Sequence, residues 1–516
     1  MSSQDDTRRA GLVWKEDLFQ LTPTWEHEPS LDAIREVCCE HLGLSVDNVA
    51  SEGEDVCTIT FRAAGALNRV YTVDSVKGKF IMRVTLPVDP GYKTRGEVST
   101  LRFIRENTTI PVPEVIAFDD TSSSKIGFEW ILMEFISGQS LYYCWRKFTM
   151  EQKTTLVQRV AELQSQLFQF RSIGNSSTLR GIGTLGTDND FDIPGRIVSF
   201  PFVEGDCYDY DVPRGPFRSS HDWLQTRLQI IQLKKLEEIE QAEDDDDEEI
   251  ARAGLEASQY LMSVLPKISP PSQTYDAERT AIFHHDLSEM NIMVNDEGHI
   301  TGIIDWECVS AMPSWMATNT PAFLRGPERD EEPSRDGYAD ETEEDRERAR
   351  QCGTDDGLDN EGKNKLYWIH LKEYESTQLK KVYDTSMQQM LPTWEEMVKD
   401  AELQLDFYQC VENAAVSLHN RTTCAWAKSI EKGVMVRKDD AMDIDDDEDS
   451  EDGDDEDDGS EDDCSEVEEH GNDDHEDDEH DDDDHKDDVP QSDDHKDKEH
   501  ENEEPENKEH ELGIWL

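Results

Sequence analysis

The chain has 516 residues and a formal net charge of −69, with 50 Lys and Arg against 119 Asp and Glu. This excess of acid argues against a general nucleic-acid binder, because phosphate contacts need a surplus of Lys and Arg. The charge is uneven, since residues 439–516 hold 43 acidic residues and four lysines. We therefore expect a globular body followed by an acidic tail that is disordered.

The start of the chain and its cysteines favour an intracellular protein. The ten cysteines form no CxxC pair and no Cys/His spacing typical of zinc. We expect no secretory signal, because no apolar stretch follows the first charged residues, and no apolar run reaches the roughly 18 residues that a membrane helix needs. We expect a cytoplasmic location, with the nucleus as the alternative, and neither membrane nor nucleic acid as a partner.

The N-terminal third is expected to change from helix to sheet. Residues 1–50 are predicted to form a helical extension, because Leu31–Leu42 places apolar side chains on one helical face. Residues 51–137 contain short β-rich runs separated by glycines, which is typical of antiparallel strands. One helix is expected among them, over 97–106, so this region is predicted to be a small sheet lobe.

Residues 138–437 are expected to form a mainly helical lobe, because their apolar positions follow a helical period. Two acidic segments interrupt it. Residues 241–250 are predicted to be a loop between helices, and residues 325–363 a disordered insert. The chain is therefore expected to be α+β, with one lobe mainly of strands, one lobe mainly of helices, and a cleft between them.

A period of five residues marks the tail, residues 438–516. Histidine opens seven of the nine blocks that start at His470. This repeat is typical of an expanded coding repeat, and it could also bind metals or polycations weakly, because imidazole and carboxylate are both metal ligands. The tail is thus expected to keep the protein dissolved, to bind basic protein partners, or to regulate the protein by competing for a basic patch.

The strongest chemical signal is a pair of polar turns between apolar strands. The first runs from His284 to Asn291 and contains Asp286, and the second ends a strand at Asp305. Carboxylate and amide oxygens suit Mg²⁺, and a further carboxylate can take the proton of a hydroxyl. Phosphoryl transfer needs this combination, and H-x-D-x-x-x-x-N with a later Asp is the arrangement of a kinase catalytic loop.

These residues lie in a longer resemblance. The segment HHDLSEMNIMVNDEGHITGIIDWECVSAMPSW resembles the aminoglycoside phosphotransferase/choline kinase-like family, and its fungal members in particular. The segments GALNRVYTV, KFIMRV, TRGEVSTLRFIRENTTIPVPEVIAF and FEWILMEFISGQSL resemble its phosphate-binding hairpin, third strand, following helix and strand, and hinge. The resemblance covers roughly residues 30–435 and implies the two-lobed protein-kinase-like fold.

The resemblance implies a role for each matching residue. Asp286 would be the catalytic base, next to the structural loop histidine His284, while Asn291 and Asp305 would hold Mg²⁺. His285 and Glu307 are candidates for substrate contact, with packing or capping as the alternative. The residues expected to bind ATP are Gly65, Asn68, Arg83, Glu97, Met133, Glu134 and Ile136.

The sequence thus predicts an ATP-dependent phosphotransferase that moves the γ-phosphoryl group to a hydroxyl of a small molecule, with ATP and Mg²⁺ as cofactors. Two departures from the family keep an alternative open. Arg83 stands where protein kinases have Lys, and the hairpin offers Gly65 alone instead of G-x-G-x-x-G. The alternative is a catalytically weak kinase-like binding protein whose acidic tail binds basic partners.

Overall fold

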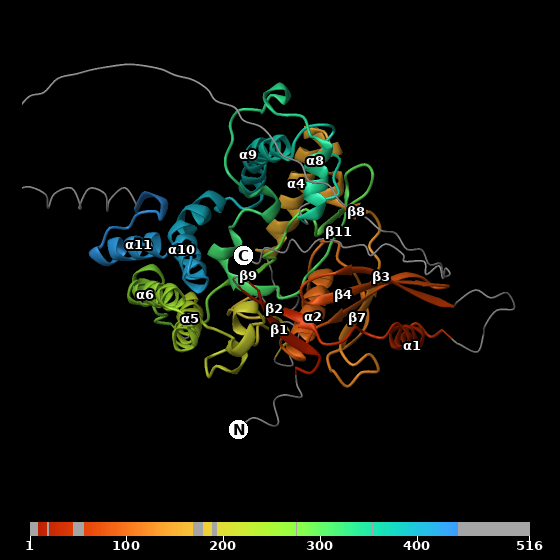
Figure 1. The fold of residues 1–516 in the computed structure, drawn as a ribbon, viewed down its shortest axis with the longest axis horizontal. Helices are drawn as coiled ribbons and strands as arrows, with labels where there is room; N and C mark the ends of the chain where they lie inside the picture. The colour runs from red at the N-terminus through yellow and green to blue at the C-terminus, as the bar shows by residue number, and fades with distance from the viewer. Residues whose placement is uncertain are drawn as a thin grey trace, which may run out of the picture. The chain divides into compact units, whose positions relative to one another are not determined.

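The part of the chain that can be described contains both expected lobes (Figure 1). The acidic tail from residue 442 onward lies outside the described residues, so its disorder and its repeat stay predictions. None of the described helices combines the length and the apolar character needed to cross a bilayer. The computed structural model describes residues 9–17, 20–44, 56–168, 179–187, 193–274, 276–352 and 356–441.

The N-terminal extension is only partly helical, which corrects the prediction for residues 1–50. Strands β1 (Leu12–Asp17) and β2 (Gln20–Trp25) pair as an antiparallel hairpin, and only α1 (Leu31–His41) is a helix. The Trp25 ring meets Phe128 edge-on at 4.8 Å between centroids. Because the hairpin packs on residues far away in the chain, a local sequence period could not reveal it.

The sheet lobe is a five-stranded antiparallel sheet with the strand order β3-β4-β5-β7-β6. In the β4–β5 pair, Asn68 lies opposite Thr85 and Val70 lies opposite Arg83. Helix α2 packs against β6 and β7. These elements are β3 (Cys57–Ala64), β4 (Asn68–Ser75), β5 (Gly78–Thr85), α2 (Tyr92–Asn107), β6 (Val115–Asp119) and β7 (Glu129–Glu134).

The second lobe is mainly helical, as expected, and short strands hold its polar turns. Strand β10 (Ile292–Val294) pairs with β8 (Gln139–Ser140) and with β11 (Ile300–Ile303), and β9 (Thr280–Phe283) pairs with β12 (Ser310–Pro313). Helices α5 and α6 pack together, as do α4 and α9. The helices are α3 (Leu141–Cys144), α4 (Met150–Leu167), α5 (Ser220–Gln241), α6 (Asp245–Ile268), α7 (Ser314–Ala317), α8 (Glu343–Gln351), α9 (Lys365–Met390), α10 (Trp394–Ala415) and α11 (Asn420–Lys432).

The first acidic segment is mostly helix, so the loop predicted over 241–250 is wrong for most of its length. Helix α6 begins at Asp245, and the Asp244 side chain caps it by accepting from the Asp247 backbone N–H at 2.9 Å. Carboxylates are favourable in the first turn, because they face the positive end of the helix dipole. The acidic run therefore starts the helix and does not interrupt it.

The second acidic segment is also ordered where it is described, which corrects the disordered insert predicted over 325–363. Helix α8 lies inside it and begins with a reciprocal capping box between Thr342 and Asp345. The Arg329 Nε donates to Glu373 of α9 at 3.0 Å. Low apolar content predicted disorder, but the charged side chains pair with each other and with α9.

Candidate active site

The first polar turn joins β9 to β10 and brings together two residues that were expected to act together. The Asn291 side chain donates from Nδ2 to Asp286 Oδ2 at 2.7 Å and to the Asp286 carbonyl at 2.9 Å. Asp286 is exposed, whereas Asn291 is buried. Because the amide nitrogen faces Asp286, the amide oxygen is the atom of Asn291 that can face a cation.

The second polar turn is tied to the first by backbone bonds. The Ile304 N–H donates to the Asn291 carbonyl at 3.0 Å, and the His284 Nε2 lies 3.2 Å from the Ile304 carbonyl. The next residue, Asp305, has φ +62°, a left-handed conformation that is uncommon for a residue other than glycine. Strain of this kind gathers at functional sites, where surrounding contacts hold it in place.

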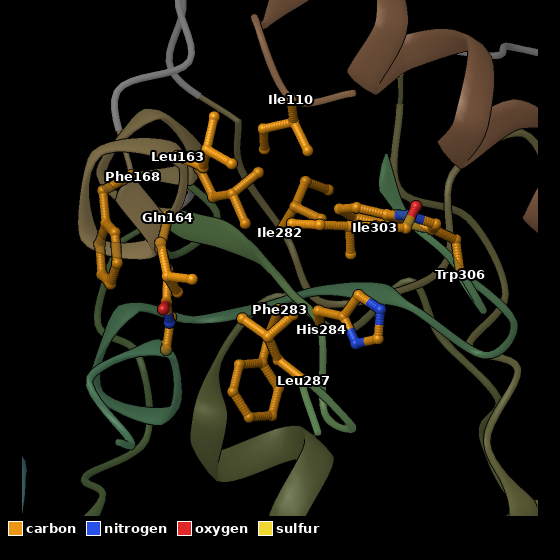
Figure 2. A pocket seen from close by; sticks show the side chains of 13 residues that line it. Ile110, Leu163, Gln164, Phe168, Ile282, Phe283, His284, Leu287, Ile303 and Trp306 are labelled. Atoms are coloured by element: carbon orange, nitrogen blue, oxygen red, sulfur yellow. The ribbon is translucent and has the colours of Figure 1, made fainter. Parts of the chain in front are cut away.

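His284 is buried and holds the loop in position. Burial lowers its pKa to about 4, with a further contribution from His285, so the ring is neutral at pH 7. Because the Ile304 carbonyl can only accept, the neutral ring must donate from Nε2. Trp306 packs edge-on against the ring at 4.8 Å between centroids, and Figure 2 shows both side chains beside one pocket.

Arg83 joins the sheet lobe to the second polar turn. Its guanidinium donates to Glu97 Oε1 at 2.7 Å and to Asp305 Oδ1 at 2.8 Å, and lies 2.7 Å from Glu307 Oε2. The Arg83 side chain is only 9% exposed. Burial lowers the pKa of this guanidinium, but the three carboxylates together raise it above its usual range, so Arg83 stays charged.

A second buried cation, which the sequence interpretation missed, completes this group. The Lys93 ammonium lies 2.6 Å from Glu307 Oε2 and 2.6 Å from Thr85 Oγ1, and donates to Asn68 Oδ1 at 3.2 Å. Helix α2 starts five residues before the predicted helix, which puts Lys93 and Glu97 on one face, four residues apart. This spacing is the signal that could have revealed Lys93.

Glu307 faces the sheet lobe. Its Oε2 also accepts from Asn68 Nδ2 at 2.9 Å. Burial raises the pKa of Glu307, but Arg83 and Lys93 outweigh it and hold the pKa well below its usual range. The partners of Glu307 are thus two cations and the amide of Asn68, all from the sheet lobe. The other candidate for substrate contact, His285, is half-buried, and its ring centroid lies 6.3 Å from that of His284.

The remaining residues expected to bind ATP line the sheet lobe. Gly65 is exposed at the β3–β4 turn, where an added Cβ would meet nothing within 4 Å. Met133 is buried near the end of β7. The Glu134 N–H already donates to the Glu114 carbonyl at 2.9 Å, so it is not free to bind adenine. Ile136 is half-buried and follows the strand.

Gly302 shows how closely the hinge approaches the second turn. A Cβ at this position in β11 would lie 2.6 Å from Ile136 Cγ2, so the close approach requires glycine. The Thr301 hydroxyl also donates to the Ser137 carbonyl at 2.6 Å. The hinge is therefore fixed against the strand that leads to Asp305.

The pocket in Figure 2 is separate from these charged residues. It is lined mainly by apolar side chains of α4, β9 and β11, together with His284 and Trp306. Its lining includes none of Asp286, Asn291 or Asp305. We interpret it as packing space behind the polar turns, because phosphate chemistry needs the charged groups themselves.

The oxygen atoms at the two turns fit Mg²⁺. Within the described ranges, no group of three or more His, Cys, Asp or Glu is placed to hold a metal. Mg²⁺ does not need such a group, because it takes one or two protein oxygens, several waters and substrate phosphates. Asn291 has its amide oxygen to offer, and Asp305 has Oδ2, since its Oδ1 accepts from Arg83.

Comparison with known proteins gives one family and several distant relatives. A sequence model of the phosphotransferase enzyme family matches residues 58–352. A subtelomeric hrmA-associated cluster protein of Aspergillus fumigatus is 27% identical over 320 residues, which cover 52% of this chain and 61% of that protein. The altered inheritance of mitochondria protein 9 of Saccharomyces cerevisiae is 24% identical over 359 residues, covering 59% and 55%. The chain thus spans less than two thirds of the length of these relatives.

Solved structures with similar folds include aminoglycoside phosphotransferases. The gentamicin complex of APH(2″)-IIa has a TM-score of 0.39 and 14% identity, and the match covers 80% of this chain and 98% of that one. The ternary complex of APH(2″)-IIa with streptomycin and ATP has a TM-score of 0.37 and 13% identity, with the same coverage.

Proposed function

The chain belongs to the phosphotransferase enzyme family, and on this premise we propose that it moves the γ-phosphoryl group of ATP to a hydroxyl of a small molecule. One observation carries the proposal. Asn291 holds the Asp286 carboxylate at 2.7 Å, and backbone bonds tie this pair to the turn that presents Asp305. A base and two metal-binding oxygens are what phosphoryl transfer requires.

Each residue of the two turns has a distinct task in this mechanism. Asp286 Oδ2 is oriented by Asn291, so Oδ1 is the atom that accepts the proton of the attacking hydroxyl. The hydroxyl oxygen then bonds to the γ-phosphorus as the bond to the β-phosphate oxygen breaks, which leaves ADP and a phosphorylated product. Mg²⁺, held by Asn291 and Asp305, would neutralise the phosphates, and neutral His284 keeps the two turns in register.

Two features of the sheet lobe support ATP as the donor. Arg83 carries a permanent charge beside the second polar turn, and this charge attracts phosphate oxygens. The turn at Gly65 leaves open space above the backbone, where phosphates can approach. The acceptor is proposed to be a small molecule because the named structural neighbours bind gentamicin or streptomycin.

The test is a screen of hydroxylated metabolites in which ATP consumption is measured with the full-length protein. For an acceptor found in this way, Asp286→Asn is expected to lower turnover by roughly 10²- to 10⁴-fold, the usual contribution of a general base. Asp296→Asn is the matched control, because this exposed carboxylate lies in the turn between β10 and β11. Full turnover by Asp286→Asn would refute Asp286 as the base.

The alternative function is a kinase-like binding protein. It is favoured by Arg83, whose bond to Asp305 Oδ1 occupies one oxygen of the expected metal ligand. In that case the acidic tail would bind basic protein partners. Thermal unfolding with millimolar ATP distinguishes the two functions, since a rise in Tm that needs Mg²⁺ supports the enzyme and its absence supports the binding protein.

The place of action remains a prediction. We propose the cytoplasm, with the nucleus as the alternative, and no partner among nucleic acids or membranes. Two of the relatives, from Eremothecium gossypii and Saccharomyces cerevisiae, carry the word mitochondrial in their names. Microscopy of the tagged full-length protein would decide among these compartments.

A further inference from the structure

Five charged side chains from both lobes form one group of ion pairs, called here the charged cluster: Arg83, Lys93, Glu97, Asp305 and Glu307. Four of them are largely buried, whereas the Asp305 side chain is 37% exposed. It holds two cations and three carboxylates, so its formal net charge is −1. Buried charges are tolerated only when they are paired and hydrogen-bonded. Loss of either cation would therefore leave at least one carboxylate of the cluster without its partner.

Lys93 connects three separate segments. Its ammonium group has three N–H donors, and three acceptors surround it: Glu307 Oε2, Thr85 Oγ1 and Asn68 Oδ1. Asn68 is the first residue of β4, just after the Gly65 turn, whereas Thr85 ends β5. The Lys93 side chain is only 1% exposed. It thus links the turn expected over the phosphates to the turn that presents Asp305.

Glu307 shows what the loss of Lys93 would do. A single oxygen of Glu307 receives Arg83 at 2.7 Å, Lys93 at 2.6 Å and Asn68 at 2.9 Å. Without Lys93, Arg83 would be the only cation for three carboxylates, and the formal charge of the cluster would become −2. Such a site repels a polyphosphate more strongly, because charges interact strongly where water is excluded.

We propose that Lys93 is a positioning residue for nucleotide binding: it neutralises Glu307 and fixes Asn68, so that the charge of Arg83 stays available to the phosphates of Mg·ATP. Lys93 is too deeply buried to be assigned a contact with the nucleotide itself. The inference rests on the proposed function, because it presupposes that the two lobes bind Mg·ATP.

The experiment measures the Kd of Mg·ATP by calorimetry with the full-length protein and its Lys93→Met variant. We expect a Kd at least about tenfold higher for Lys93→Met, since the additional uncompensated negative charge repels the phosphates where water is excluded. Lys153→Met is the matched control. Lys153 is equally buried and lies 2.6 Å from Glu375, away from the charged cluster. It is expected to lower Tm while leaving the Kd within about twofold.

Two further variants separate charge from packing. Glu307→Gln in the Lys93→Met background is expected to recover most of the binding, because it removes the carboxylate that Lys93 neutralises. Lys93→Arg keeps the charge and is expected to bind within about threefold of the wild type. If Lys93→Met does not fold, the double variant and Lys93→Arg are compared directly with the wild type, since each keeps the formal charge of the cluster at −1. A Kd more than about tenfold higher for both would overturn the role of the Lys93 charge.

The outcomes distinguish this inference from the proposed function. A folded Lys93→Met that binds Mg·ATP like the wild type would overturn the role of Lys93 and leave the proposed function intact. A double variant no better than Lys93→Met would do the same. If the wild type itself does not bind Mg·ATP, the proposed function fails and the role of Lys93 fails with it.

Discussion

The first polar turn is built from residues close together in the sequence, whereas the charged cluster is built from residues far apart in the sequence. Asp286 and Asn291 are five residues apart, and one side-chain amide closes the loop between them. Arg83 and Asp305, in contrast, are 222 positions apart and meet only because the lobes are folded. A short loop can be read from the sequence as a motif, whereas the cluster becomes visible only when β4, β5, α2 and the second turn are placed together.

The largest effect on Mg·ATP binding is expected from Asp305, which belongs both to the second polar turn and to the charged cluster. Asp305→Asn should raise the Kd of Mg·ATP roughly a hundredfold, because even groups that only support a metal ligand contribute about 10- to 100-fold to metal affinity. Asp286→Asn should leave this Kd nearly unchanged, since the base acts on the hydroxyl. Calorimetry with both variants tests whether Asp305 acts in nucleotide binding and Asp286 only in the transfer step. Equal Kd values for Asp305→Asn and wild type would show that Asp305 holds no metal.

The next effect compares two buried arginines. Arg83→Met should destabilise the fold by about 3 kcal/mol, since it leaves buried carboxylates unpaired. Arg227→Met should cost about the same, because Arg227 is 3% exposed and lies 2.7 Å from Glu412. Only Arg83→Met should also weaken Mg·ATP binding. Urea unfolding and calorimetry together test this. Similar ATP affinities for the two variants would show that Arg83 does not contribute to phosphate binding.

A smaller effect concerns the start of α2, which carries Lys93. Glu129 accepts from the Gly91 N–H at 2.7 Å, and burial raises the pKa of Glu129 from its usual 4.5 to about 7. The folded state therefore binds the proton more tightly than the unfolded chain. The stability from this group is fully present below pH 4.5 and is lost as the pH rises to about 7.

Glu129→Gln should remove this pH dependence. At pH 7.5 the variant is expected to be more stable than the wild type, by about 3 kcal/mol at most, because it no longer has to bury a charge. Urea unfolding at pH 4.5 and 7.5 checks the sign. A wild type that gains stability between these two pH values while Glu129→Gln does not would contradict the assignment.

The smallest effect is expected at the glycine of the hairpin. Gly65→Ala should change the Kd of Mg·ATP by less than about threefold, because an added methyl meets nothing within 4 Å. Gly302→Ala is the contrasting variant, since its Cβ would lie 2.6 Å from Ile136. A large loss with Gly65→Ala would mean that the phosphates lie directly against this turn.

The sequence predicted the two-lobed fold, the family and the loop that holds both Asp286 and Asn291, because each depends on short segments with specific spacing. The hydrogen bond between these two side chains is seen only in the structure. It did not predict the β1–β2 hairpin or helix α8. The hairpin is stabilised by contacts such as Trp25 with Phe128, and the segment around α8 by ion pairs with α9. Lys93 was missed because its acceptors lie on three separate segments and because the predicted helix began only at Glu97, which hid the four-residue spacing of Lys93 and Glu97.

The central claim is that the two turns and the charged cluster together bind ATP through Mg²⁺. Calorimetric titration of ATP into the full-length protein, with and without Mg²⁺, tests it most directly. The account predicts saturable binding with Mg²⁺ that is lost or strongly weakened without it. No binding with Mg²⁺, or equal binding in both conditions, would contradict it.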